Sequence, residues 1–153
     1  MATQYTAGLS AGQVLTAATM NQIGAAWETY TPTVKAGATT LTGTVLYARY
    51  ARIQKTVWVQ VSFRSNSAGA ANGIITVSYP SGLTPVTTGA GDQTIGTFHI
   101  LDSGTAWYVG SAVPTNPIQG IAYGGGNYMG AATPAMTIAN NDAISVAVCY
   151  EVA

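Results

Sequence analysis

The sequence predicts an all-β fold, a sandwich or barrel built from about eight short strands. Segments rich in β-branched and aromatic residues are separated by turns rich in glycine, proline, asparagine or aspartate. Residues 56–63 and 143–152 alternate strictly between apolar and other side chains, which is the period of a half-buried strand. Only 7% of the residues are charged, whereas an average domain has about 25%. Glycine and uncharged polar residues must therefore supply most of the surface.

The N-terminal segment is predicted to differ from the rest of the chain. Residues 1–15 are small and polar, and they predict an extended arm. Residues 15–24 predict a short helix, because Thr16 is a favourable N-cap and Gly24 stands where a C-cap glycine belongs. A helix this short is marginal alone, so it must pack on its own domain, a sister chain or a neighbouring protein.

The domain organisation follows from this helix. Met20 and Ile23 share its apolar face. We expect residues 1–26 to be an arm and helix that dock the protein, and residues 27–153 to be the β-domain. The full prediction is a β-sandwich with a short N-terminal helix and an extended arm.

From residue 27 onward the chain is predicted to consist of strands and turns. Pro32 indicates that the first strand is an edge strand or that the strand ends there. Residues 35–43 are predicted to be a linker or long turn, and residues 65–73 a loop. The predicted strands are 27–34, 47–53, 56–64, 73–79, 94–101, 105–113, 118–123 and 143–152.

The central element is a hairpin at residues 47–64, which holds four of the five basic residues. Residues 57–63 are predicted to be the central core strand, with Trp58 on its opposite face. The turn at Gln54 and Lys55 has the usual two-residue length without the favoured Asn-Gly or Asp-Gly sequence.

The outward faces of the predicted strands carry few charges. Ala143, Ala147 and Cys149 alternate with the core positions of the last strand. The net charge of the chain is zero, and a neutral surface favours association. We therefore predict a symmetric oligomer. The residues predicted to line the subunit interface are Trp58, Met20, Ile23 and Ala147.

Five short stretches carry a series of motifs. Residues 11–21 (AGQVLTAATMN) precede residues 27–32 (WETYTP), and residues 48–57 (ARYARIQKTV) span the hairpin turn. Residues 78–83 (SYPSGL) and 141–146 (NDAISV) add two further motifs. Together they resemble motifs of bacteriophage virion proteins of the tail-fibre, minor-tail and head-decoration type.

The resemblance implies a jelly-roll-like virion domain, usually trimeric, that is displayed on a capsid or tail. Its partners would be its own copies and the capsid or tail proteins of the particle. Ala48 and Gln54 depart from the pattern, in which glycine is usual at both positions. This departure concerns the geometry of the hairpin turn and not the presence of its strands.

Catalytic chemistry is not predicted. His99 is the only histidine, so a serine or cysteine relay would depend on this one mid-strand residue, and no G-x-S-x-G motif occurs. Cys149 is the only cysteine, and its apolar neighbours predict a buried, inert thiol. One histidine and one cysteine also exclude a zinc site within one chain. We expect a protein that is not an enzyme and that has no cofactor.

The acidic turns and glycine clusters are interpreted as loop structure. Asp92, Asp102 and the turn 140–142 offer oxygen ligands for calcium, but Asp and Asn are also ordinary turn residues. The glycine clusters 89–91 and 124–126 are not followed by Gly-Lys-Ser/Thr or by a helix, so they do not predict a phosphate loop. No metal site is predicted from these residues.

Sugar binding is the one ligand hypothesis with chemical support. Aromatic rings can stack on the C–H faces of sugars, and amide side chains can bind their hydroxyls. The alternative interpretation places the same aromatic residues in the core or in a subunit interface. The candidate glycan contacts are Trp107, Tyr108, Asn116, Gln119, Tyr123, Asn127 and Tyr128.

Two functional hypotheses follow. The first is a virion structural protein that is displayed on a capsid or tail as a homotrimer. The alternative is a receptor-binding adhesin that recognises host-surface glycan through tyrosine and tryptophan loops. Nucleic acid is not an expected partner, because five scattered cations form no phosphate-binding stripe. No apolar run is long enough to enter a membrane and no signal peptide is recognised, so we expect synthesis in the host cytoplasm.

Overall fold

The computed structural model has an all-β architecture. The predicted helix at 15–24, and with it Met20 and Ile23, lies outside the residues that the structure describes. No helix occurs among the described residues. The described residues are 26–67, 71–86, 93–122, 127–131 and 134–153.

The structure assigns twelve strands to these residues, most of them close to the predicted positions. The strands are β1 (Glu28–Thr29), β2 (Val34–Ala36), β3 (Thr39–Thr40), β4 (Gly43–Ile53), β5 (Thr56–Ser65), β6 (Ala71–Asn72), β7 (Ile75–Val77), β8 (Gly96–Asp102), β9 (Ala106–Val113), β10 (Ile118–Ala122), β11 (Thr137–Ile138) and β12 (Ala143–Glu151).

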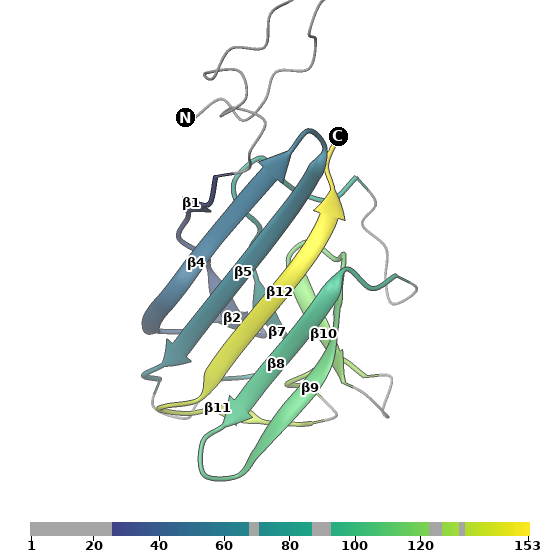
Figure 1. Ribbon diagram of the computed structural model, residues 1–153. Helices are drawn as coiled ribbons and strands as arrows, with labels where there is room; N and C mark the ends of the chain where they lie inside the picture. The colour runs from purple at the N-terminus through teal and green to yellow at the C-terminus, as the bar shows by residue number, and fades with distance from the viewer. Residues whose placement is uncertain (1–25, 68–70, 87–92, 123–126, 132–133) are drawn as a thin grey trace, which may run out of the picture.

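Ten strands form one curled antiparallel sheet in the order β1-β4-β5-β12-β8-β9-β10-β7-β2-β3, and β6 and β11 form a separate pair. Figure 1 shows β4, β5, β12 and β8 at the front, with β2, β7 and β10 behind them. Buried side chains from both halves belong to one hydrophobic cluster. The curled sheet therefore encloses a single core.

The centre of this core is the pair β5 and β12, as the alternation predicted. Val57, Val59 and Val61 are fully buried on β5. Ile144 on β12 pairs with Phe63, and the same register continues along both strands. Full burial of one such side chain contributes about 1.5–3 kcal/mol, so these two strands supply a large part of the stability of the domain.

The segment predicted as a linker contains a short hairpin. Val34 and Ala36 on β2 face the core, and Gly37 turns the chain back into β3 with a φ of 57°. That left-handed conformation is accessible to glycine at little cost. The predicted strand 27–34 is also divided, because β1 pairs with β4 whereas β2 pairs with β7. Glycine and alanine content alone therefore misled the prediction for residues 35–43.

The predicted hairpin turn at Gln54 and Lys55 is confirmed, since β4 ends at Ile53 and β5 begins at Thr56. Gln54 has a φ of 53°, and Lys55 is not among the residues with positive φ. A side chain in the left-handed region costs about 1–2 kcal/mol. Gln54 therefore carries backbone strain that a glycine would not.

Replacing Gln54 with glycine is expected to stabilise the protein. Relief of the strain exceeds the extra chain entropy of glycine in the unfolded state, so the free energy of unfolding should rise by about 0.5–1 kcal/mol. Lys55→Gly is the matched control and should lower it by about the same amount, because no strain is relieved there. Urea denaturation measures both, and equal effects of the two changes would refute the assignment of strain to Gln54.

The turn before β12 is fixed by Asp142, whose side chain is only 1% exposed. Its Oδ1 accepts a hydrogen bond from the Ser103 amide at 2.8 Å, and its Oδ2 accepts one from the Ala139 amide at 2.7 Å. Ser103 lies in the β8–β9 turn, so Asp142 ties that hairpin to the start of β12. Both oxygens of this carboxylate accept hydrogen bonds from backbone amides, which agrees with the interpretation of residues 140–142 as an ordinary turn.

Asp142→Ala is expected to lower the free energy of unfolding by about 2–3 kcal/mol, because two amide groups lose a charged acceptor. Asp142→Asn should have a smaller effect, since one acceptor oxygen remains. Asp102→Ala, at the end of β8 in the hairpin that Asp142 contacts, is the control and should cost less than about 1 kcal/mol. Thermal or chemical denaturation measures these differences. Equal losses of unfolding free energy in Asp102→Ala and Asp142→Ala would contradict a stabilising role for the Asp142 carboxylate.

A cluster of tyrosines closes one part of the core. The rings of Tyr79 and Tyr150 meet edge to face, with centroids 5.0 Å apart. The Tyr150 hydroxyl donates to the Leu83 carbonyl at 2.7 Å, and the Tyr30 hydroxyl donates to the Ser78 carbonyl at 3.2 Å. The buried Tyr79 hydroxyl has no hydrogen-bond partner in the described part of the chain. Burial is the main cause that raises the pKa of all three phenols above the usual value near 10.

Candidate functional site

The outward side of β4, β5, β12, β8 and β9 is poor in charge and rich in large apolar side chains. We call it the aromatic face. Successive side chains of a strand point to opposite faces of the sheet, so the residues next to each core residue point outward and form this face. Trp107 is 63% exposed and Trp58 is 37% exposed on this face. Its principal members are Tyr47, Trp58, Trp107, Val109, Ala147 and Cys149.

A hollow of about 290 Å³ lies on the aromatic face. Trp58 is directly opposite Cys149, and the neighbouring outward pair is Gln60 and Ala147. The structure thus brings together Trp58 and Ala147, two of the four residues predicted for a subunit interface. Trp27 adds a second indole to the lining of the hollow. The other two predicted interface residues, Met20 and Ile23, lie outside the described residues.

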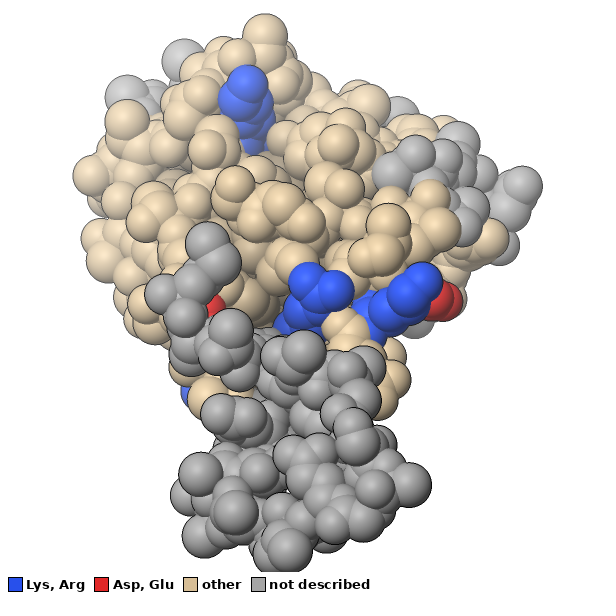
Figure 2. Space-filling model, turned by 90° about the horizontal axis from the view of Figure 1, so that it is seen from above, with Lys and Arg blue, Asp and Glu red and all other residues tan. Residues whose placement is uncertain are grey.

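Arg49 stands beside this hollow and is held by uncharged groups. Its guanidinium carbon lies 4.7 Å from the centre of the Trp27 ring and 5.6 Å from that of Tyr47. Its Nε and Nη2 both donate to Gln60 Oε1, at 3.0 and 2.8 Å. Cation–π contact and a neutral acceptor therefore position this cation. Figure 2, a view of one end of the molecule, shows Lys and Arg side chains in a few patches, one of them beside an acidic side chain, on a surface whose other described residues are mostly uncharged.

Cys149 corrects the prediction of a buried thiol. It is exposed, because it occupies the outward row of β12 between the buried residues Val148 and Tyr150. Partial desolvation raises the pKa of the thiol, which lowers the share of reactive thiolate at neutral pH. The apolar neighbours in sequence belong to the other face of the strand, so they were no guide to its surroundings.

The opposite side of the molecule is polar and rich in hydroxyls. We call the outward side of β3, β2, β7 and β10 the hydroxyl face. Lys35 pairs directly with Thr40 on one side and with Thr76 on the other, and Thr76 pairs with Gln119. A hollow of about 440 Å³ opens here. Its lining includes Thr33, Lys35, Thr76, Ser78 and Pro117.

The hydroxyl face was not recognised from the sequence. Lys35 alternates with the buried residues Val34 and Ala36, and this alternation was the available signal. The alternation spans only three residues, and the composition of residues 35–43 predicts a linker instead. Thr76 belongs to a predicted strand, but its place next to Lys35 depends on pairing between segments about forty residues apart.

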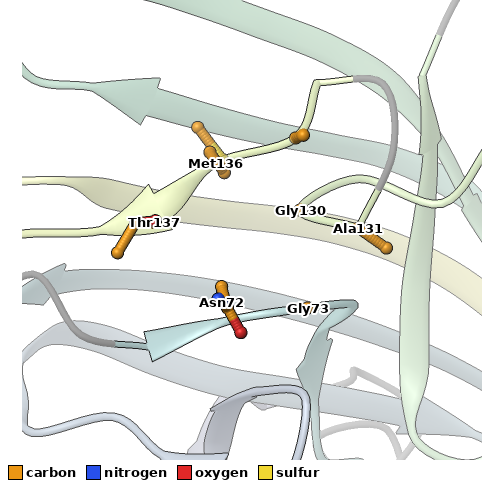
Figure 3. Close-up of a pocket in the computed structure, with 7 residues that line it drawn as sticks. Asn72, Gly73, Gly130, Ala131, Met136 and Thr137 are labelled. Atoms are coloured by element: carbon orange, nitrogen blue, oxygen red, sulfur yellow. The ribbon is translucent and has the colours of Figure 1, made fainter.

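A third hollow, of about 460 Å³, lies beside the small β6–β11 sheet. In Figure 3 Asn72 on β6 and Thr137 on β11 lie on facing strands, and Gly73 and Gly130 border the hollow without side chains. A Cβ atom at Gly130 would meet Ile75 at 2.8 Å, so this position excludes larger residues. The labelled lining offers an amide and a hydroxyl but no ionisable group.

The predicted glycan contacts do not form one site. Trp107 and Tyr108 are neighbours on β9 and therefore point to opposite faces, with Tyr108 packed against the core. Asn116 follows the far end of β9. Tyr128 bridges to Ile121 on β10, away from Trp107. Asn127 accepts a hydrogen bond through its carbonyl from Ala122, and Tyr123 lies outside the described residues. Gln119 is the one member that belongs to the hydroxyl face.

The described residues contain no group of three or more His, Cys, Asp and Glu side chains that could hold a metal ion.

His99 lies in the outward row of β8, between Ser145 and Val109 on the neighbouring strands. Among the described residues, none forms a helix long and apolar enough to span a membrane.

Comparison with known proteins adds no assignment to this geometry: no protein-family model, no curated protein sequence and no solved structure matches the chain.

Proposed function

We propose that this chain is a structural protein of the bacteriophage virion, displayed on a capsid or tail as a homotrimer. Its role is structural rather than catalytic. In this proposal residues 27–153 form a jelly-roll-like sandwich whose two leaves are the two halves of the curled sheet. Residues 1–26 form an arm with a short helix that docks on capsid or tail proteins. The single core between the front and back strands supports the two-leaf arrangement.

The observation that carries the proposal is the aromatic face. Soluble monomers rarely expose apolar patches larger than a few hundred Å². Here Trp27 and Trp58 are 45% and 37% exposed around one hollow, on a chain of zero net charge. Tyr47, whose ring centre lies 5.6 Å from the Arg49 guanidinium carbon, is 49% exposed. Aromatic residues are enriched at the centres of protein interfaces, and charged residues are depleted there. The face is thus suited to contact with another copy of the chain.

The location on a particle is tested by imaging. Cryo-electron microscopy of virions that encode this chain should show three copies together at each display position on the capsid or tail. Mass spectrometry of purified particles should identify the chain as a stoichiometric component. Particles that lack the chain entirely would refute a virion role.

A second candidate function is recognition of host-surface glycan. The observation that favours it is Trp107, whose indole is 63% exposed near the β8–β9 turn. An exposed indole can stack on a sugar ring. A glycan array should then give a signal that Trp107→Ala removes, and an array without any signal would leave only the structural role.

A further inference from the structure

The hollow on the hydroxyl face combines a cation with several hydroxyl groups, and we propose that it binds an anionic saccharide. The acid group would pair with Lys35, and neighbouring sugar hydroxyls would bind Thr33 and Ser78. Thr76 is only 8% exposed and would be reached at the floor of the hollow. The site lies on another face than the one proposed for subunit contact. It deepens the second candidate function but does not depend on the trimer or on Trp107.

The floor of the hollow is rigid because it is the back of the core. Val34, Ala36, Ile75 and Val77 are at most 2% exposed, and they alternate with Lys35 and Thr76 on the two strands. A side chain whose neighbours are fixed by core packing has a fixed Cα–Cβ direction. The Cβ atoms of Lys35 and Thr76 are thus fixed before any ligand arrives, which reduces part of the entropic cost of binding. The four-carbon side chain of Lys35 stays flexible and can adapt to the position of the acid group.

The polar groups are spaced regularly. Thr40, Lys35, Thr76 and Gln119 are direct cross-strand partners in four neighbouring strands. Neighbouring strands lie about 4.8 Å apart. The Cα atoms of these four residues therefore lie at roughly equal intervals, and their side chains bring two hydroxyls, an ammonium and an amide to the same face. Such a row can contact successive substituents along an extended chain of sugars.

The hydrogen bonds at the edge of the hollow orient Ser78. Its Oγ accepts from the Thr33 amide at 2.9 Å, and its amide donates to the Thr33 carbonyl at 2.9 Å. Because Oγ accepts from the backbone, the Ser78 hydroxyl proton remains available for an acceptor in the hollow. Lys35 contributes three further donors.

Charge selects the class of ligand. No carboxylate lines the hollow, and Lys35 has no carboxylate partner among the described residues. The lining also has no aromatic ring, so a neutral sugar would gain no stacking energy there. An acid group gains a Coulomb attraction to the Lys35 ammonium that a neutral sugar hydroxyl does not gain. The hollow therefore favours a saccharide that bears a carboxylate or a phosphate. Its volume of about 440 Å³ lies within the usual range for ligand sites.

The test is an NMR titration of the full chain, labelled with ¹⁵N. The probes are a hyaluronan tetrasaccharide for the carboxylate, glycerol phosphate for the phosphate, and tetra-N-acetylated chitotetraose as the neutral match of the first. We expect an anionic probe to shift the amides of Lys35, Thr76 and Ser78, and we expect chitotetraose not to shift them. The probe that binds more tightly identifies the acid group.

The matched variants are Lys35→Met and Lys55→Met, which remove the two lysines of the chain in turn. Lys35→Met should weaken binding at least tenfold, and Lys55→Met, in the β4–β5 turn, should change it less than twofold. Circular dichroism checks that both variants fold. The proposal is overturned if no anionic probe binds at millimolar concentration, or if chitotetraose binds equally well. It is also overturned if Lys35→Met binds like the native protein. Loss of binding in Trp107→Ala alone would place the site on the aromatic face instead.

Discussion

Above about pH 10 the protein should lose stability steeply and unfold cooperatively. Tyr30, Tyr79 and Tyr150 have pKa values raised by burial, whereas in the unfolded chain they ionise near pH 10. Between these values the native state keeps three protons that the unfolded state has lost. The stabilisation is thus fully present below pH 10 and is lost as the pH rises toward the native pKa values.

The expected slope is large. Each retained proton lowers the free energy of unfolding by about 1.4 kcal/mol per pH unit, so three of them lower it by about 4 kcal/mol per unit. A domain with a stability of about 5–10 kcal/mol, which is within the ordinary range, would unfold between about pH 11 and 12.5. Denaturant titrations at several pH values, followed by circular dichroism, measure the slope. Tyrosinate absorbance shows whether ionisation coincides with unfolding.

The control is Tyr79→Phe, which removes the phenol that has no hydrogen-bond partner among the described residues. At neutral pH this variant should be as stable as the native protein or more stable, because no hydrogen bond is lost. Above pH 10 its slope should fall by about one third. Tyr150→Phe should lower the slope similarly but cost about 1 kcal/mol at neutral pH, since it loses the bond to Leu83. Stability that stays constant up to pH 12 would contradict the buried state of all three phenols.

Trp58→Glu should dissociate the proposed trimer without unfolding the domain. Trp58 is 37% exposed and lines the hollow of the aromatic face together with Ala147. Tryptophan at the centre of an interface often contributes 2 kcal/mol or more, and a carboxylate there would be desolvated without a partner. The effect recurs at each contact in a closed ring, so we expect assembly to weaken at least a thousandfold. Analytical ultracentrifugation at a series of concentrations measures this change.

Trp107→Glu is the matched control for this prediction. It places the same charge at a more exposed tryptophan on the same face, outside the hollow. We expect its assembly to change less than tenfold. If Trp58→Glu keeps the native mass while it remains folded, the subunit contact does not lie at the hollow. Equal dissociation by both variants would show that the contact covers the whole face rather than its hollow.

The strands that depend on local alternation could be predicted, and those that depend on distant pairing could not. Residues 57–63 and 143–152 repeat the period of two often enough to identify a core strand on each. Val34 and Ala36 show the same period over only three residues, where glycine and alanine nearby resemble a linker. The order of strands in the sheet places β2 next to β7 and β1 next to β4, and no residue in either short strand specifies that partner.

The same limit applies to the candidate sites. Trp58 and Ala147 could each be assigned to the outward row of its own strand, because each lies in a long alternating strand. The structure then pairs those two strands and places both residues on one face. Trp107 and Tyr108 could not be assigned together, because adjacent residues of a strand point to opposite sides. Lys35 gained its neighbours only through pairing with β3 and β7. Composition located aromatic and amide residues, but only the register decides which of them share a face.

The most direct test of the proposed virion role is the mass of the native chain in solution at micromolar concentration, measured by light scattering coupled to size-exclusion chromatography. We expect a mass three times that of one chain, unchanged over a tenfold dilution. A monomeric mass at all of these concentrations would contradict it, because the aromatic face would then be exposed to water without a second copy to cover it.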